Sequence, residues 1–246
     1  MRRARRVQHA APPRPAGPAA SLRGGWARRA GGLWTLGVLF GSLAAPVHAQ
    51  RLSVGAGAFN AQRRIYLQTA VQEQTGVLVG GSGTVRAGRA GLAVSGWIGT
   101  LKGDGSAANP DVKARTTAAV AQVLLAPGVR AGVQYEVRRV EAGSVVSVWK
   151  MMGVNARLEP GFGVPGLAGL VDVSTLPASS TSGGPKITMA VQVTLGVAYE
   201  PRRGPLSFRL GYRFERFDFE AAGSAGARYE QFGGLAAEVG VRVGGR

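Results

Sequence analysis

The sequence contains no cysteine and only two histidines, His9 and His48. Without cysteine, neither a disulfide framework nor a thiolate metal site can form. Both histidines lie within the first 49 residues, so residues 50–246 have no imidazole to serve as a general base or as a zinc or copper ligand. We therefore expect residues 50–246 to be non-enzymatic, with no catalytic residue, no metal site and no cofactor.

Long hydrophobic runs and an even spread of charge are missing too. No stretch after residue 50 has 18 consecutive apolar residues, which excludes a membrane-spanning helix in that part of the sequence. The net charge is +17, but residues 1–49 contain eight arginines and no acidic residue, which leaves 22 basic and 13 acidic residues for the remainder. Because the positive charges of residues 50–246 are interleaved with acidic residues across the expected strands, we expect no nucleic-acid partner.

Residues 1–49 have the layout of a secretory leader. An Arg- and Pro-rich segment without core-forming residues precedes the apolar run Leu33–Ala45, and Val47 and Ala49 are small residues at the −3 and −1 positions of a cleavage site. The sequence predicts a cleaved signal peptide ending at Ala49, with a disordered n-region and a short signal helix. A permanent anchor is the competing interpretation, but a 13-residue helix reaches only about 20 Å. Sec export, twin-arginine export through Arg28-Arg29 and a start downstream of Met1 stay open.

The remaining chain alternates apolar and small or polar residues with a period of two, which predicts β-strands. The clearest run is Lys186–Glu200, where one face carries Ile187, Met189, Val191, Val193, Leu195, Val197 and Tyr199. In Leu206–Glu215, Leu206, Phe208, Leu210, Tyr212 and Phe214 form the apolar face. The opposite faces mix Gly, Ala, Thr, Gln and paired charges, which suits the interior of a small barrel with an apolar outside.

The spacing of these runs predicts ten strands, and eight to twelve remain compatible with it. The expected strands lie near 51–60, 76–86, 90–101, 113–125, 129–139, 144–158, 162–173, 186–199, 206–218 and 229–243. Tight turns are expected at Arg86–Arg89, Ala126–Gly128, Glu159–Gly161 and Pro201–Gly204, and longer loops at Lys102–Asp111, Ser174–Pro185 and Glu220–Arg228. The segment Ala61–Gln74 is either part of a first long loop or a further strand. Short turns on one side and long loops on the other are typical of outer-membrane barrels.

A leader followed by such strands, ending with the run Leu235–Val243, resembles the small bacterial outer-membrane β-barrel proteins. The resemblance is one of pattern and covers residues 50–246. It implies an all-β, antiparallel, up-and-down transmembrane barrel in the cell outer membrane of a Gram-negative cell. It also implies outer-membrane lipid and the outer-membrane assembly machinery as partners, an extracellular ligand at the long loops, and a monomer.

Charged residues on the inferred inner faces are the candidate site. They are Arg130, Glu136, Arg138, Arg157, Glu159, Arg209, Arg213, Glu215, Glu238 and Arg242. Two interpretations are open: a salt-bridged plug that stabilises a closed barrel, or a narrow pore that favours anions. Aromatic residues supply girdles at the membrane interfaces in one interpretation and pack singly within the sheet in the other; they are Tyr66, Trp97, Trp149, Tyr199, Tyr212, Phe217, Phe219, Tyr229 and Phe232.

Three functions follow as hypotheses. The first is a non-enzymatic outer-membrane barrel with a structural or surface-interaction role. The second is a narrow, anion-leaning passive channel, in which Arg209 and Arg213 would set the preference. The third is a soluble periplasmic β-sandwich that binds a ligand or partner.

Overall fold

The computed structural model describes residues 50–67, 70–106, 108–201, 204–220 and 229–244. The expected signal peptide and its signal helix lie outside the described residues. Within those ranges, no helix is long and apolar enough to cross a membrane.

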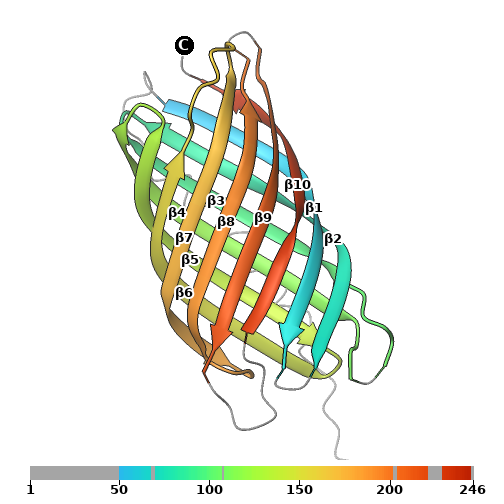
Figure 1. Cartoon of the computed structure of the whole chain (residues 1–246). Helices are drawn as coiled ribbons and strands as arrows, with labels where there is room; N and C mark the ends of the chain where they lie inside the picture. The colour runs from blue at the N-terminus through green and yellow to red at the C-terminus, as the bar shows by residue number, and fades with distance from the viewer. Residues whose placement is uncertain (1–49, 68–69, 107, 202–203, 221–228, 245–246) are drawn as a thin grey trace, which may run out of the picture. The chain divides into compact units, whose positions relative to one another are not determined.

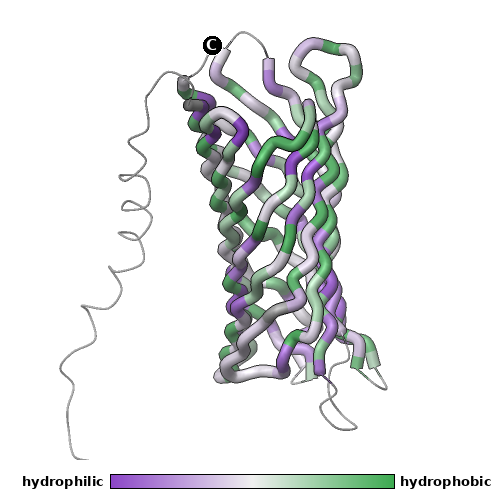
Figure 2. The backbone as a smooth tube through the Cα atoms, turned by 90° about the vertical axis from the view of Figure 1, so that its left-hand side faces the viewer, coloured by the Kyte–Doolittle hydropathy of each residue, from purple (hydrophilic) through white to green (hydrophobic). Residues whose placement is uncertain are grey.

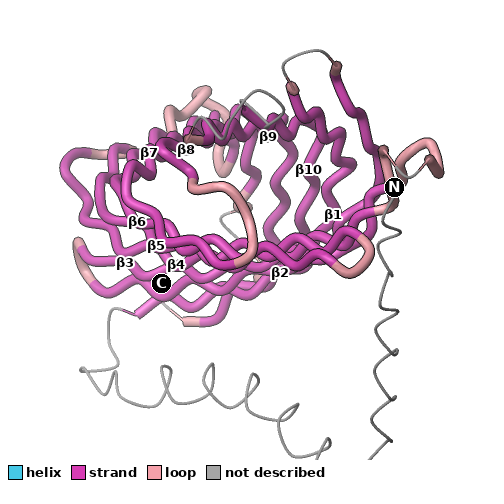
Figure 3. Tube along the Cα trace, turned by 90° about the horizontal axis from the view of Figure 1, so that it is seen from below, coloured by secondary structure: helices cyan, strands magenta, loops and turns pink. Residues whose placement is uncertain are grey.

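Ten antiparallel strands close into a single barrel, as the sequence predicts (Figures 1 and 3). Each strand pairs with its sequence neighbours, and β1 closes the ring by pairing with β10 from Leu52↔Val243 to Tyr66↔Tyr229. The strands are β1 Gln50–Tyr66, β2 Val71–Ala87, β3 Ala90–Leu101, β4 Val112–Ala126, β5 Val129–Ala142, β6 Val145–Leu158, β7 Leu167–Ser182, β8 Ile187–Tyr199, β9 Leu206–Phe219 and β10 Tyr229–Val243. The β-sandwich hypothesis is therefore wrong, because one closed ring replaces two packed sheets.

Strand β1 begins and strand β10 ends at the same edge of the barrel, which we call the turn end. Gln50 pairs with Ala87 beside the β2–β3 turn, and Val243 pairs with Leu52. The β2–β3 and β4–β5 connections there have two residues each, and Gly128 supplies the positive φ of 75° that the second of them requires. The opposite edge, which we call the loop end, carries the connection Lys102–Asp111, of which all residues but 107 are described.

The strands at the loop end are longer than the sequence suggested. The ambiguous segment Ala61–Gln74 is neither a long loop nor a further strand: β1 continues to Tyr66, and β2 begins at Val71. The expected loop Ser174–Pro185 is wrong in most of its length, because β7 extends to Ser182. A membrane-spanning strand needs about 9–11 residues. The 17 residues of β1 and of β2 therefore extend beyond what a bilayer requires.

At the turn end one connection also differs from the expectation. The tight turn expected at Glu159–Gly161 is a longer connection that runs from the end of β6 at Leu158 to the start of β7 at Leu167. Within this connection, Pro160 and Phe162 lie against Gly169 near the start of β7. The Gly169 amide donates to the Pro160 carbonyl at 2.8 Å. Connection length alone therefore does not separate the two ends.

The outer face of the barrel is apolar, and alternation along the strands is visible in Figure 2. Side chains exposed on it by half or more come from all around the ring and include Val54, Val79, Ile98, Val123, Val133, Val154, Leu195, Leu210, Leu235 and Val239. No sheet or helix among the described residues covers them. Apolar side chains outside and polar ones inside are the reverse of a soluble barrel and match a barrel surrounded by lipid.

One residue of the predicted outer face points inward instead. The register of β8 against β9 shifts between Ile187 and Met189, which marks a β-bulge. The extra residue reverses the alternation, so Ile187 is 1 % exposed and lies in the interior, while Met189 remains outside. The face assignment of Ile187 from period-two spacing was wrong for this reason.

Candidate functional site

The ten charged residues predicted for the barrel interior lie at two levels, one nearer the loop end and one nearer the turn end. Glu136, Arg138 and Glu215 are buried in the half nearer the loop end. The others lie toward the turn end in partly exposed positions: Arg130, Arg157, Glu159, Arg209, Arg213, Glu238 and Arg242. The assignment of a functional role to them stays a prediction.

Buried aromatic and aliphatic side chains fill the interior near the loop end. Trp149 packs against Phe219 with ring centroids 6.2 Å apart, and Phe217 meets Phe232 edge to face at 6.4 Å. Leu101, Met151 and Leu176 are each 0 % exposed. We call this group the loop-end plug; its buried members are Phe59, Ala61, Leu78, Trp97, Leu101, Val112, Ala114, Val140, Trp149, Met151, Leu176, Ile187, Ala190, Phe217 and Phe232.

An ion-pair network is embedded in the loop-end plug. The guanidinium of Arg138 pairs with Glu230 and, at 3.4 Å, with Glu215, and it lies 4.1 Å from the ring centroids of both Phe217 and Phe232. Arg63 reaches the other oxygen of Glu230 at 2.8 Å. All four charged side chains are at least nine-tenths buried, so the network cross-links β1, β5, β9 and β10 in the absence of bulk water.

Amide and hydroxyl groups form a hydrogen-bonded layer next to this network. Gln192 donates to Glu136 at 2.6 Å, Gln134 donates to Gln192 at 2.8 Å, and Ser174 donates to Gln134 at 2.7 Å. Asn155 continues the chain by donating to Ser174 at 2.9 Å. These contacts join strands β5, β6, β7 and β8 across the lumen, and satisfy polar groups that the sequence placed on inner faces.

Toward the turn end the interior opens into two adjoining cavities. The inner one has a volume of about 190 Å³, and the outer one, which reaches the turn end, about 1390 Å³. Thr84 and Arg209 line both of them. We call the two together the basic vestibule; its charged lining residues are Arg51, Arg86, Arg157, Glu159, Asp172, Glu200, Arg209, Arg213, Glu238 and Arg242.

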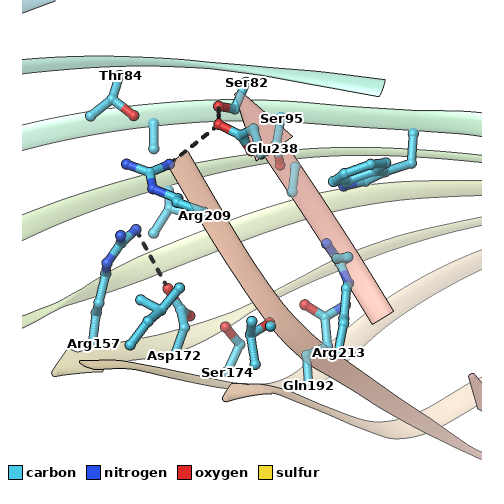
Figure 4. Close-up of a pocket in the computed structure, with 18 of the residues that line it drawn as sticks. Ser82, Thr84, Ser95, Arg157, Asp172, Ser174, Gln192, Arg209, Arg213 and Glu238 are labelled. Atoms are coloured by element: carbon cyan, nitrogen blue, oxygen red, sulfur yellow. Dashed lines mark hydrogen bonds and ion pairs between the residues drawn. The ribbon is translucent and has the colours of Figure 1, made fainter. Parts of the chain in front are cut away.

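Arginines and carboxylates of the basic vestibule alternate around its wall. Arg157 lies 2.7 Å from Glu159 and 3.9 Å from Asp172, while Arg209 lies 3.4 Å from Glu238. Figure 4 shows Arg157 of β6 and Arg209 and Arg213 of β9 projecting into the inner cavity. Arg242 pairs with Glu200 at 3.3 Å. The result is a wet, charged chamber on the turn side of the plug, with more guanidinium groups than carboxylates.

Several interior charges were not among the predicted site residues. Arg63 lies in the segment Ala61–Gln74, whose structure the sequence left ambiguous, and Glu230 is the second residue of β10. Arg86 was expected where strand 76–86 meets a tight turn; it is the penultimate residue of β2 and faces inward with Thr84. The continued period-two spacing from Gln74 to Arg86 was the signal that could have found it.

The expected aromatic girdles are only partly present. Tyr66 and Tyr229 stack outside with ring centroids 4.3 Å apart, and Tyr199 and Tyr212 are exposed on the outer face. The prediction is wrong for five of the nine aromatics, which lie in the interior or pack against the loop-end plug: Trp97, Trp149, Phe217, Phe219 and Phe232. Their inward position is what fills the lumen.

Comparison with known proteins gives structural similarity only. The sequence matches no known family model and none of the curated proteins. Among solved structures, the chain is similar to the Neisserial surface protein A (16% identity over 77% of this chain and 96% of that one, TM-score 0.38). It is also similar to the translocator domain of the autotransporter NalP from Neisseria meningitidis (10%, 85% and 94%, TM-score 0.42). A third is Ail, the attachment invasion locus protein of Yersinia pestis (12%, 79% and 99%, TM-score 0.34).

Proposed function

We propose that this protein is a closed, non-conducting outer-membrane barrel that has a structural or surface-interaction role. The apolar outer face of the ring supports the membrane location, because hydrocarbon is the solvent in which such a face is stable. The loop-end plug supports the absence of a pore. In this proposal lipid surrounds a monomeric barrel that the outer-membrane assembly machinery inserts, with the turn end toward the periplasm.

The observation that carries the proposal is the packing of the interior near the loop end. A passive channel needs a continuous wet path, and the charged network of Arg138, Glu215 and Glu230 lies inside apolar packing instead. The arginines of the basic vestibule favour anions there, but a solute entering from the turn end meets the plug. We therefore prefer the closed barrel to the anion-leaning channel.

The loop end supports a surface-interaction role because hydrogen bonds tie one of its connections to β2. In the connection Lys102–Asp111, the Asn109 side chain donates to the Glu73 carbonyl at 3.0 Å and accepts from Gln74 at 3.1 Å. Outer-face charges, among them Arg64 and Lys113, surround this end beyond the apolar belt. A partner would thus meet a preformed polar rim, at low cost in conformational entropy.

Single-channel recording in a planar bilayer tests the closed state. We expect no stable conductance from the wild-type barrel, and openings in a Trp149→Ala, Phe217→Ala double variant, because two large interior rings are then removed. The matched control is a Tyr199→Ala, Tyr212→Ala variant, which removes rings from the outer face and should stay silent. A steady wild-type conductance whose anion preference falls when Arg209 and Arg213 are neutralised would establish the channel instead.

The connection Lys102–Asp111 should loosen in acid. The hydrogen bond from Lys102 lowers the pKa of Asp111, and the hydrogen bond from the Ser106 side chain lowers the pKa of Asp104. A carboxyl whose pKa is lowered by folding stabilises the fold above its ordinary pKa, and that contribution disappears as the pH falls through the lowered value. Amide hydrogen exchange at Gly103 and Ser106, corrected for the intrinsic pH effect, should accelerate below about pH 4.

An Asp111→Asn variant should show faster exchange at Gly103 already at neutral pH, since it lacks the carboxylate that the Gly103 amide and Lys102 contact. Exchange that is unchanged by both acid and this substitution would mean that the Asn109 contacts alone hold the connection.

A further inference from the structure

The basic vestibule is a dead-end cavity that opens at the turn end of the barrel. Its outer part is lined by residues of the turn-end connections, and its inner part stops at the polar layer of Gln134, Ser174 and Gln192. A solute of modest size can therefore enter from one side and has no exit through the plug. Such geometry suits a binding site rather than a path.

Three arginines lie close together on one side of the barrel interior: Arg86 and Arg157 line the cavity, and Arg130 lies beside them without lining it. Arg130 of β5 and Arg157 of β6 are direct partners in the strand register, and both point inward. Arg86 of β2 lies across from them: a side chain at Gly91 would come within 3.7 Å of Arg86 and 3.8 Å of Arg130. Like charges directly opposite each other on paired strands are destabilising unless an anion compensates them.

The protein supplies too few carboxylates for that compensation. Glu159 lies 2.7 Å from Arg157 and 3.7 Å from Arg86, and Asp172 is 3.9 Å from Arg157. No carboxylate of the described residues lies within 4.0 Å of Arg130. Its buried Nε also has no hydrogen-bond partner in that part of the chain. Arg130 is thus a half-buried cation with free donors beside two other cations.

The opposite wall repeats the pattern in a milder form. Arg209 and Arg242 share Glu200 at 3.7 and 3.3 Å, and the Nε atoms of both are buried without a hydrogen-bond partner among the described residues. Guanidinium donors therefore line the vestibule on two sides. A tetrahedral oxyanion has enough acceptor oxygens to meet several of them at once.

We propose that a phosphate-type oxyanion enters the basic vestibule from the turn end and binds at its wall beside Arg86, with the neighbouring Arg130 as its principal contact. Guanidinium groups match phosphate oxygens through paired, charge-assisted hydrogen bonds, which a monatomic anion cannot accept in the same way. The free ion and a phosphate monoester present the same group, and the cavity of about 1390 Å³ has room for either.

Calorimetric titration of the folded protein in zwitterionic detergent micelles, in a chloride background, tests this site. The probes are inorganic phosphate and glycerol phosphate. Arg130→Gln should weaken binding about tenfold or more, because one charge-assisted contact is lost. Since Arg130 has no ion-pair partner in the described part of the chain, its removal leaves no carboxylate unpaired. Arg130→Lys, which keeps the charge and loses the fork, should bind with intermediate affinity.

The matched control is Arg139→Gln, on the same strand but exposed on the outer face beside Glu141. Loss of affinity in Arg130→Gln and not in Arg139→Gln supports the site. Tighter binding of glycerol phosphate than of phosphate would identify an ester as the natural ligand class, and the reverse the free ion. Absence of binding to the wild type, or equal binding by Arg130→Gln and wild type, overturns the proposal. Bilayer silence is measured separately, so a failure of the closed-barrel function is distinguishable from a failure here.

Discussion

Replacing Arg138 with methionine is expected to lower the free energy of unfolding by about 3–5 kcal/mol, since breaking a buried ion pair leaves uncompensated charge. In this barrel the substitution would leave two carboxylates, Glu215 and Glu230, without their shared guanidinium at positions 5 % and 3 % exposed. Arg63 still contacts Glu230, and Arg213 still contacts Glu215 at 2.5 Å, so each carboxylate keeps one guanidinium and the loss should lie at the lower end of this range. The measurement is urea-induced unfolding of the protein refolded into lipid vesicles.

The control for Arg138→Met is Arg139→Met at the next position of β5. Arg139 is half-exposed on the outer face, and its pair with Glu141 at 2.7 Å is accessible to solvent. Exposed pairs contribute about 0–1 kcal/mol, so this variant should unfold almost as the wild type does. Equal losses for the two variants would mean that the interior near the loop end is hydrated, and the closed-barrel proposal would lose its main support.

Replacing Leu210 with arginine is expected to destabilise the membrane-embedded barrel by about 2–4 kcal/mol, the cost of a cation on the lipid face near the midplane. Leu210 is 54 % exposed, and its cross-strand neighbours Val197 and Ala237 are apolar as well. The exposed surface there has no polar partner for a guanidinium. Unfolding in vesicles again gives the free energy, and the loss should shrink in short-chain detergent micelles, where the charge reaches water.

Thr188→Arg is the matched comparison for Leu210→Arg, since Thr188 is an exposed residue of β8 near the loop end and its hydroxyl donates to the Asp218 carbonyl. An arginine at this exposed position near the loop end reaches water, so we expect a change within about 0.5 kcal/mol, as for most surface substitutions. A Leu210→Arg variant as stable as Thr188→Arg would show that water, not lipid, meets the apolar face.

Much of the fold could be predicted from local spacing. Side chains of a strand alternate between its two sides whatever the strand pairs with, so Leu195 and Leu210 were assigned to the outer face correctly. The same rule failed where the strand was irregular: the bulge at Ile187 adds one residue and leaves no sequence signature. Polar ends such as Ser179 to Ser182 also escaped prediction, because pairing with β6 holds them in the sheet although they have no apolar face.

Less of the candidate site could be predicted, because its contacts join distant parts of the sequence. The inward direction of Arg138 followed from alternation, but Glu230, with which it pairs, is 92 residues away, and Arg63 and Glu230 are 167 residues apart. The aromatics show the same limit. Trp149 and Phe217 were candidates for interfacial rings, and only the closed barrel shows that both lie buried in its interior.

Alternation within single strands was therefore enough to establish an all-β chain with one apolar and one polar face per strand, because that geometry is a property of the backbone alone. The pairing of β1 with β10, which closes the ring, determined how the side chains are arranged in the interior. It turned the polar faces toward a common axis, brought Arg86 of β2 and Arg157 of β6 beside one carboxylate, and filled the loop end with rings. Inter-strand register governs these contacts, and register depends on all ten strands pairing at once.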